Sequence, residues 1–393
     1  MAAGVESRPV PGAYFDNNAT TPLDPRVREA MLPWMAEAWG NASSAHRFGQ
    51  RANAAVESAR VAVARLVGGA PEQIVFTASG TEANNAVCAA LLGRAGPGDH
   101  VVVSAIEHPS ILGACEHWSE ANGVRVTRIA PGPDGVVAAD ELLAAVGPET
   151  RLVALMLVNN ELGTVQPVAE VARACRARDI PVLCDAVQAA GKIEVSIREL
   201  DVDYLTLGAH KFHGPLGAAA LWLRDGAPFA PLLLGGGQER RRRASTVNVP
   251  AVVGFGRACE LAADELSARA RALAALRDRF EAGLGAIPDA VVHGSRAPRV
   301  PHTSSVAFPG VVNVELMMRL DLAGFAVSTG AACGSGTVQP SPTLSAMGLA
   351  PELATSSIRV SFGLLNTADE VESFLPVLAR EVSALRAEST AAV

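Results

Sequence analysis

The sequence predicts an α/β protein in which helices cover both faces of a mainly parallel sheet, followed by a smaller α+β domain. Up to about residue 250, apolar runs of strand length alternate with helical patterns, which is typical of crossover units in a parallel sheet. Beyond Pro250 strands and helices alternate less regularly. The chain has 393 residues, more than one hydrophobic core usually holds, so two domains are expected.

Short apolar runs in the first part of the chain predict the buried strands of the sheet. They lie at residues 74–76, 101–103, 124–129, 152–158, 181–184, 204–207 and 218–223. Helical patterns between several of them cover residues 81–92, 139–146 and 168–178. We therefore expect a large α/β domain over residues 16–255.

The second part of the chain predicts the smaller domain. An alanine- and arginine-rich pattern from residue 250 to about 286 predicts a long connecting helix. Shorter elements follow at 304–308, 312–322, 325–328 and 357–362, and a terminal helix begins at about Ala368. We expect a C-terminal domain over residues 256–393, joined by the N-terminal segment 1–15.

Composition and charge argue against several classes of protein. The formal net charge of -7 is unlike that of a nucleic-acid or membrane-surface binder, which carries clustered positive charge. No apolar run is long enough to span a bilayer, and the first residues contain no apolar signal segment. The six cysteines are scattered without metal-ligand spacing, which argues against a zinc site or a disulfide framework. We expect a soluble, cytoplasmic protein without a metal site, acting on a small substrate.

Lysine is nearly absent from the chain. Among 33 basic residues only Lys192 and Lys211 are lysines. An enzyme that forms a Schiff base with an aldehyde cofactor needs a lysine amine, because arginine stays protonated and does not condense with a carbonyl. Lys211 lies in Thr206-Leu-Gly-Ala-His-Lys-Phe-His-Gly-Pro215, whereas Lys192 lies in a connecting segment and is expected to face solvent. Taken alone, the pattern is equally consistent with two lysines left by chance.

Polar residues follow several predicted strands, at the edge where open α/β sheets bind ligands. Residues 77–85 form a small-residue turn that opens a helix, and its N–H groups suit either a phosphate or an ordinary capped helix start. Asn160 follows the strand at 152–158, and Asp185 and Gln188 follow the strand at 181–184. A strand-end aspartate can keep a pyridine nitrogen protonated, or it can cap a helix.

A phosphate-type turn, an asparagine, an Asp-x-x-Gln and a lysine, each after a buried strand, together make the inventory of a pyridoxal-phosphate site. The sequence also resembles the cysteine desulfurases among the fold-type I, class V aminotransferase-like enzymes, over nearly the whole chain. The motifs that carry this resemblance are Tyr14-Phe-Asp-Asn-Asn-Ala-Thr-Thr21, Gly40-Asn-Ala-Ser-Ser44, residues 76–85, Glu107-His-Pro109, Asn159-Asn-Glu-Leu-Gly163, residues 185–188, Ala209-His-Lys211, Gly235-Gly-Gly-Gln-Glu-Arg240, Ser328-Thr-Gly-Ala-Ala-Cys-Gly-Ser-Gly336 and Ser356-Ser-Ile-Arg359.

The resemblance implies roles for the polar residues at the sheet edge. Lys211 would hold pyridoxal 5'-phosphate as a Schiff base and later move protons on the substrate. Asp185 would pair with the pyridinium nitrogen, and Gln188 would reach the ring hydroxyl with Asn160 near the same edge. His108 matches a histidine that stacks on the ring and serves in proton transfer.

The resemblance also implies how the phosphate is held. Gly80, Thr81 and His210 would contact it together with Thr246 of the partner subunit, so that a homodimer completes the site. Gly208 is expected to contact the cofactor as well, although it replaces a polar residue common in the family.

Two further departures concern the same region. Ser245 stands where many members have glycine, and Leu216 stands where many have lysine. These departures leave the details of phosphate binding open, while the chemistry is unaffected.

Cys333 separates desulfuration from other pyridoxal chemistry. It lies in a glycine-rich stretch that predicts a mobile loop over residues 328–340, whereas Cys88 and Cys184 have apolar neighbours and are predicted to be buried. The resemblance implies that L-cysteine becomes L-alanine while Cys333 takes the sulfur as a persulfide for an acceptor protein. Arg359 and Asn160 would bind the substrate carboxylate; the alternative for Arg359 is a surface ion pair.

Other functions remain open at this point. A selenocysteine lyase or another class V lyase could work without the loop cysteine, and a non-catalytic sulfur-relay or scaffold protein could have kept the fold. A papain-like thiol hydrolase is a third alternative, but its local cysteine signature is absent. The sulfur acceptor, which could serve iron–sulfur cluster assembly or the biosynthesis of other thio-compounds, is not identified by the sequence.

Overall fold

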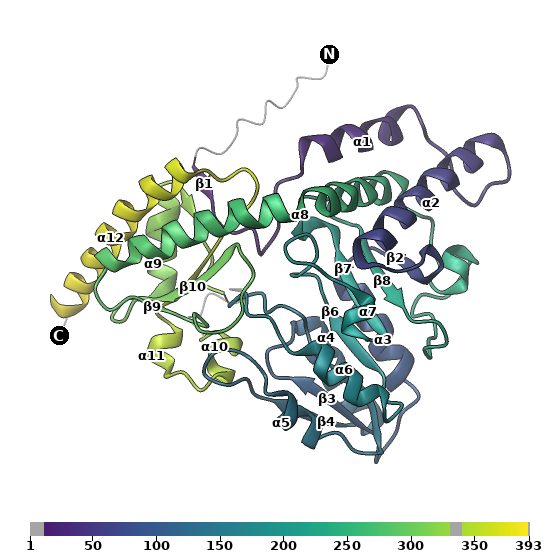
Figure 1. Ribbon diagram of the computed structural model, residues 1–393, viewed down its shortest axis with the longest axis horizontal. Coiled ribbons are helices and arrows are strands. Elements are labelled where there is room, and N and C mark those ends of the chain that lie inside the picture. Colours follow the sequence, from purple (N-terminus) through teal and green to yellow (C-terminus); the bar gives the residue numbers. More distant parts are fainter. Residues whose placement is uncertain (1–11, 331–339, 392–393) are drawn as a thin grey trace.

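A seven-stranded sheet forms the centre of the computed structural model, which describes residues 12–330 and 340–391 (Figure 1). Five consecutive strands, from β7 to β4 at one edge, are parallel to one another, and β8 is antiparallel to both β2 and β7. The mainly parallel sheet is therefore confirmed. In spatial order the strands are β2 (Ile74–Thr77), β8 (Ala219–Leu223), β7 (Tyr204–Gly208), β6 (Val182–Asp185), β5 (Thr150–Ala154), β3 (His100–Ser104) and β4 (Arg125–Ile129).

The strand predicted at residues 152–158 ends earlier, at Ala154. The chain leaves the sheet there and turns back on itself, since Val158 bridges Val165 and the N–H of Gln166 donates to the carbonyl of Leu157 at 2.9 Å. The apolar run continues because these residues are buried in the turn, so hydrophobicity alone did not reveal the strand end.

Helices cover both faces of the sheet, and neighbouring residues of one strand point to opposite faces. Val101 and Val103 pack in one core with α3 (Gly80–Leu92) and α4 (Pro109–Asn122). Val102 packs in the other core, with α2 (Arg47–Val67), α6 (Val168–Arg176) and α8 (Val249–Gly283). Both faces of the sheet are therefore buried, and consecutive residues of a strand are all apolar for this reason.

Shorter helices complete this part of the molecule. They are α1 (Pro25–Ala36), α5 (Ala139–Ala144) and α7 (Ile197–Leu200), with the 3-10 turns η1 (Pro71–Gln73), η2 (Ala209–Lys211), η3 (Gln238–Arg241) and η4 (Leu284–Ala286). Helix α8 approaches α2 closely at Gly256, where any larger residue would clash: a Cβ there would lie 2.6 Å from the Cα of Ala59.

The C-terminal residues build a second sheet with its own core. Strands β9 (Val291–Val292), β10 (Thr303–Ala307) and β12 (Ser357–Ser361) are antiparallel, and α9 (Asn313–Leu322), α10 (Pro342–Ala346), α11 (Pro351–Ala354) and α12 (Ala368–Ala391) lie on the same side of the molecule (Figure 1). The N-terminal β1 (Ala13–Tyr14) joins this part through parallel pairing with β11 (Phe325–Ala326).

This second core is separate from the two cores that flank the large sheet. Phe15 packs there against Phe362 and Phe374, with ring centroids 5.4 and 5.1 Å apart. Helix α8 runs from the large sheet to the second core, where Phe280 near its end is buried. The division into two domains stays a prediction, and the separate cores support it. In the part of the chain that the structure describes, no helix is long and apolar enough to cross a membrane.

Candidate active site

A cavity of about 570 Å³ opens at the carboxyl ends of the parallel strands, where ligands bind in open α/β sheets. Its lining residues come from segments after β2, β3, β5, β6 and β7, and from β12 and the residues after β11. The structure thus brings together most of the residues that the sequence singled out. They are Gly80, Thr81, His108, Asn160, Asp185, Gln188, His210, Lys211 and Arg359.

Lys211 lies in η2, directly after β7, and its side chain is held against the N-terminal segment. Its Nζ donates to the carbonyls of Asn18 at 2.6 Å and Ala19 at 2.8 Å. Burial and the nearby charge of Arg359 lower the pKa of the Lys211 amine to about 8, although Asp185 and Asp16 oppose the shift. A much larger fraction of this amine is therefore neutral near neutral pH than in an ordinary lysine, which favours its action as a nucleophile.

Asp185 ends β6 and is fixed by two donors. Its Oδ2 accepts from Asn84 Nδ2 at 2.8 Å, and its Oδ1 accepts from the N–H of Val187 at 2.9 Å. Asn84 is itself oriented by Thr206, whose hydroxyl donates to Asn84 Oδ1 at 2.7 Å. The carboxylate is therefore held in one orientation at the cavity wall.

His108 caps the start of α4 and lines the same cavity. Its Nδ1 accepts from the N–H of Ser110 at 3.1 Å, so the proton of the neutral ring lies on Nε2. Burial and the charge of Lys211 lower the pKa of His108, while Asp185 opposes them. A neutral ring favours stacking on an aromatic ligand and proton transfer through Nε2.

The start of α3 forms another wall of the cavity. Ser79 caps the helix through its Oγ, which accepts from the N–H of Glu82 at 3.1 Å, and Gly80 and Thr81 line the cavity at the first turn. A Cβ at Gly80 would lie 2.9 Å from Val187 Cγ2, so a larger residue there would need Val187 to shift. The first N–H groups of a helix attract anions such as phosphate.

His210 lies beside this turn. Its Nδ1 contacts Thr20 Oγ1 at 3.1 Å, and burial together with Lys211 lowers the pKa of the ring to about 4. His210 lines the cavity, and a neutral ring there can donate one hydrogen bond.

Two residues expected at the cofactor do not line the cavity. Gly208 is buried in β7, where a Cβ would lie 3.2 Å from Val187 Cγ1, so Val187 stands in the direction in which a side chain would extend. Thr246 is exposed in the segment before α8 and lies outside the cavity of its own chain. That segment is anchored by a buried ion pair between Arg60 and Glu239, with 2.7 Å between Nη1 and Oε2.

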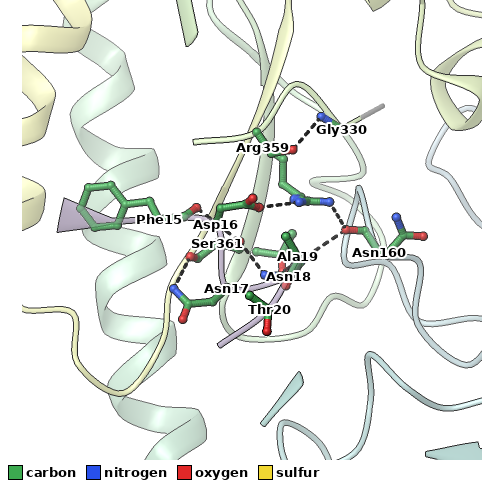
Figure 2. Close-up of polar contacts among 12 residues, drawn as sticks. Phe15, Asp16, Asn17, Asn18, Ala19, Thr20, Asn160, Gly330, Arg359 and Ser361 are labelled. Atoms are coloured by element: carbon green, nitrogen blue, oxygen red, sulfur yellow. Dashed lines mark hydrogen bonds and ion pairs between the residues drawn. The ribbon is translucent and has the colours of Figure 1, made fainter. Parts of the chain in front are cut away.

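Arg359 on β12 reaches the cavity from the C-terminal part of the molecule, as Figure 2 shows. Its Nη1 donates to the carbonyl of Asn160 at 3.0 Å, and its Nη2 pairs with Asp16 Oδ1 at 2.6 Å. Its Nε is buried and has no partner within the described residues. The side chain is 6% exposed, so the alternative of a surface ion pair is wrong.

The expectation that Lys192 faces solvent is also wrong. The residue is 4% exposed, and its Nζ donates to Gln188 Oε1 at 3.0 Å. The physical reason is local: residues 186–193 form a helical turn in which the N–H of Lys192 donates to the carbonyl of Ala189. This turn places Lys192 four residues after Gln188 on the same side.

Several polar residues of the cavity wall were missed by the sequence analysis. Asp16 and Asn18 belong to a motif that carried the resemblance but was given no role, and Asn84 lies in the turn assigned to phosphate. The signal available for Asp16 and Asn18 was their place in that motif. Ser110, two residues after His108, is a further lining residue.

Cys333 lies outside the described residues. Glu161, beside Asn160, is buried and accepts from the hydroxyls of Ser341 and Thr343, so the chain after the undescribed segment is anchored next to the cavity. The other cysteines, Cys88, Cys115, Cys175, Cys184 and Cys259, are all free and buried, which confirms the predicted burial of Cys88 and Cys184.

The chain is similar to known proteins over most of its length. The family model described as Aminotransferase class-V matches residues 13–374. A cysteine desulfurase of Cereibacter sphaeroides is 43% identical over 378 residues, which are 96% of this chain and 97% of the relative. A solved structure described as a NifS-like protein is 38% identical with a TM-score of 0.88, covering 95% of this chain and all of the other. A structure described as SspA in complex with cysteine is 31% identical with a TM-score of 0.80, covering 90% of this chain and 99% of the other.

Proposed function

Since the chain belongs to the cysteine desulfurases of the class-V aminotransferase family, we propose that its cavity binds pyridoxal 5'-phosphate and L-cysteine and that Cys333 accepts the substrate's sulfur. The observation that carries this proposal is the meeting of Lys211, Asp185, His108 and Arg359 in one cavity, although they lie far apart in the sequence.

The lining residues fit the cofactor. Lys211 provides an amine with a pKa of about 8 for attachment, and the fixed carboxylate of Asp185 suits a pyridinium nitrogen. The first turn of α3, where Gly80 and Thr81 line the cavity, suits the phosphate, because the first N–H groups of a helix attract anions. The volume of about 570 Å³ lies in the range of small-molecule sites. When bound there, the cofactor would supply an electron sink for the carbanion at the substrate's α carbon.

The chain's own residues would then orient the substrate and move its protons. The buried Nε of Arg359, without a partner in the described residues, would donate to the substrate carboxylate. Asn160 and Asp16 hold the guanidinium in place for this contact. Lys211, once its amine is free, would remove the α proton and, after the sulfur has left, return protons at the β and α carbons, and neutral His108 would assist proton transfer.

The sulfur step would be completed by Cys333. Its thiolate would attack the substrate's sulfur, so that an S–S bond forms as the substrate's C–S bond breaks. The electron pair of the broken bond stays on the substrate carbon, which takes a proton and leaves as L-alanine. The persulfide on Cys333 would then pass its sulfur to an acceptor protein.

We propose further that a homodimer completes the site, with Thr246 reaching the phosphate of the partner subunit. Its exposure and its position outside the cavity of its own chain support this arrangement. The scattered, free cysteines support a reducing cytoplasm as the location.

The proposed function is tested by adding L-cysteine and dithiothreitol to protein reconstituted with pyridoxal phosphate. L-alanine and sulfide should form in equal amounts, and D-cysteine should give neither. Pyruvate and ammonia in place of alanine would indicate simple elimination. Turnover of L-selenocysteine without turnover of L-cysteine would make the selenocysteine lyase the better account.

A further inference from the structure

Lys192 is a buried lysine that contacts Gln188, a residue of the cavity wall. It is one of only two lysines in the chain, and within the described residues it has no ion pair. Burial, together with the charges of Lys211 and Arg359, lowers its pKa well below the usual value. Burying a lysine without a counter-ion is costly, and an apolar residue could fill the same space. Among the described residues, the one side-chain hydrogen bond of Lys192 goes to Gln188 Oε1 and therefore indicates its role.

We propose that Lys192 is a positioning residue that fixes the orientation of the Gln188 amide, so that an Nε2 N–H faces the cavity and donates to the ring oxygen of the cofactor. This inference rests on the proposed function, because it assigns an indirect role in the same site. Lys192 itself would touch neither cofactor nor substrate.

The hydrogen bonds around Gln188 allow only one orientation of its amide. The Oε1 accepts from Lys192 Nζ at 3.0 Å, and the Nε2 donates to the carbonyl of Asn18 at 2.9 Å. A flipped amide would place Oε1 against the Asn18 carbonyl, two acceptors in contact, and Nε2 against the amine of Lys192. The amide nitrogen carries two N–H groups, so the one not used by Asn18 is available to the cavity that Gln188 lines.

The Asn18 end of this contact is rigid. Its side-chain Nδ2 donates to the carbonyl of Asn160 at 3.0 Å, and its Oδ1 contacts His302 Nε2 at 2.8 Å. Figure 2 shows Asn18 within the N-terminal segment and its contact with Asn160. The same Asn18 carbonyl accepts from Lys211 Nζ. Lys192 is therefore linked through Gln188 and Asn18 to the amine of Lys211, which would carry the cofactor. Within this chain of contacts, the Gln188 amide is the group that would be free to rotate if Lys192 were replaced.

The test is a double-mutant cycle on the full chain, with Lys192→Met, Gln188→Ala and the double variant. Val195→Ala is the matched control, because Val195 is buried nearby in the sequence and belongs to the apolar core. Two quantities are measured on each protein after its fold is checked by circular dichroism: the dissociation constant of pyridoxal phosphate, and the pH midpoint of the bound cofactor's spectral titration.

Lys192→Met should raise the dissociation constant about tenfold, the effect of roughly one hydrogen bond. It should also raise the pH midpoint, because a lost donor at the ring oxygen makes that oxygen more basic. Gln188→Ala should do the same, and the double variant should add little to either single change. Val195→Ala should keep wild-type values for both quantities.

Additive effects in the double variant, or wild-type values in Lys192→Met, would overturn the inference while leaving the proposed function intact. A wild-type protein that binds no pyridoxal phosphate would overturn both. If Lys192→Met loses its fold, Gln188→Ala alone decides: a wild-type pH midpoint in that variant would remove the amide, and with it Lys192, from the cofactor's surroundings.

Discussion

Arg359 and Asp16 lie 343 positions apart and form an ion pair of 2.6 Å at the wall of the cavity. Asp16 follows β1, which pairs with β11, and Arg359 belongs to β12. Their contact therefore fastens the N-terminal segment to the C-terminal sheet at the point where the substrate would bind (Figure 2). Arg359 also donates to the carbonyl of Asn160, so contacts on two sides fix its guanidinium. Its buried Nε has no partner among the described residues.

Replacing Arg359 by lysine should weaken substrate binding. A lysine has one compact ammonium group and does not contact Asp16, Asn160 and a carboxylate at the same time. We expect the KM for L-cysteine to rise about ten- to a hundredfold, while the dissociation constant of pyridoxal phosphate stays unchanged. Arg380→Lys, at an exposed arginine, is the control and should leave the KM unchanged. An unchanged KM in Arg359→Lys would separate Arg359 from substrate recognition.

Replacing Lys211 by alanine should abolish the cofactor's lysine-bound absorption band and the turnover of L-cysteine. Among the residues that the structure describes, no other amine lines the cavity, because the second lysine, Lys192, is turned toward Gln188. Visible spectra of both lysine variants check this. Lys192→Met should keep a band, with the shifted titration described above. Loss of the band in the Lys192 variant and its retention in the Lys211 variant would reverse the assignment.

Attachment of the cofactor should depend on pH through the Lys211 amine. The pKa of this amine is lowered to about 8, so it is protonated and unreactive below that pH and neutral above it. The rate at which apoprotein takes up pyridoxal phosphate should therefore rise with pH and level off above a midpoint near 8, where an ordinary lysine would need a pH near 10.4. Stopped-flow absorbance at several pH values measures this rate. A rate that still climbs at pH 10 would contradict the lowered pKa.

Asp185→Asn should still bind the cofactor but turn over L-cysteine more slowly by orders of magnitude. A neutral amide does not hold the pyridinium proton that makes the ring an electron sink. Because Asp185 also opposes the lowering of the Lys211 pKa, the midpoint for cofactor attachment should move to lower pH in this variant. Steady-state production of alanine tests the first effect, and near-normal production would remove Asp185 from the mechanism.

Much of the fold followed from the hydrophobic pattern. Strands buried on both faces appear in the sequence as apolar runs, and the polar residues that follow them, Asn160, Asp185, Gln188 and Lys211, were found in this way. His108 and His210 were expected from the family resemblance. The end of β5 was placed too late because residues 155–158 stay buried after leaving the sheet.

Lys192 shows where such reasoning stops. A lysine in a polar connection is expected at the surface, and only the turn that follows Gln188 directs it inward. The role of Asp16 was equally hidden, because its partner Arg359 comes from the other end of the chain. Contacts of this kind depend on how separate parts of the molecule pack together, and hydrophobic periodicity carries no information about that.

The central claim, that Cys333 takes sulfur from L-cysteine, is tested most directly by mass spectrometry of the protein after brief exposure to L-cysteine. One added sulfur, about 32 Da, should appear on the peptide that contains Cys333 and be removed by dithiothreitol. The buried Cys88, Cys115, Cys175, Cys184 and Cys259 serve as internal controls and should stay unmodified. In Cys333→Ser the cofactor should still bind, but sulfur release should stop, because a hydroxyl is a far poorer nucleophile than a thiolate. Added mass on a buried cysteine, or continued formation of alanine by Cys333→Ser, would contradict the account.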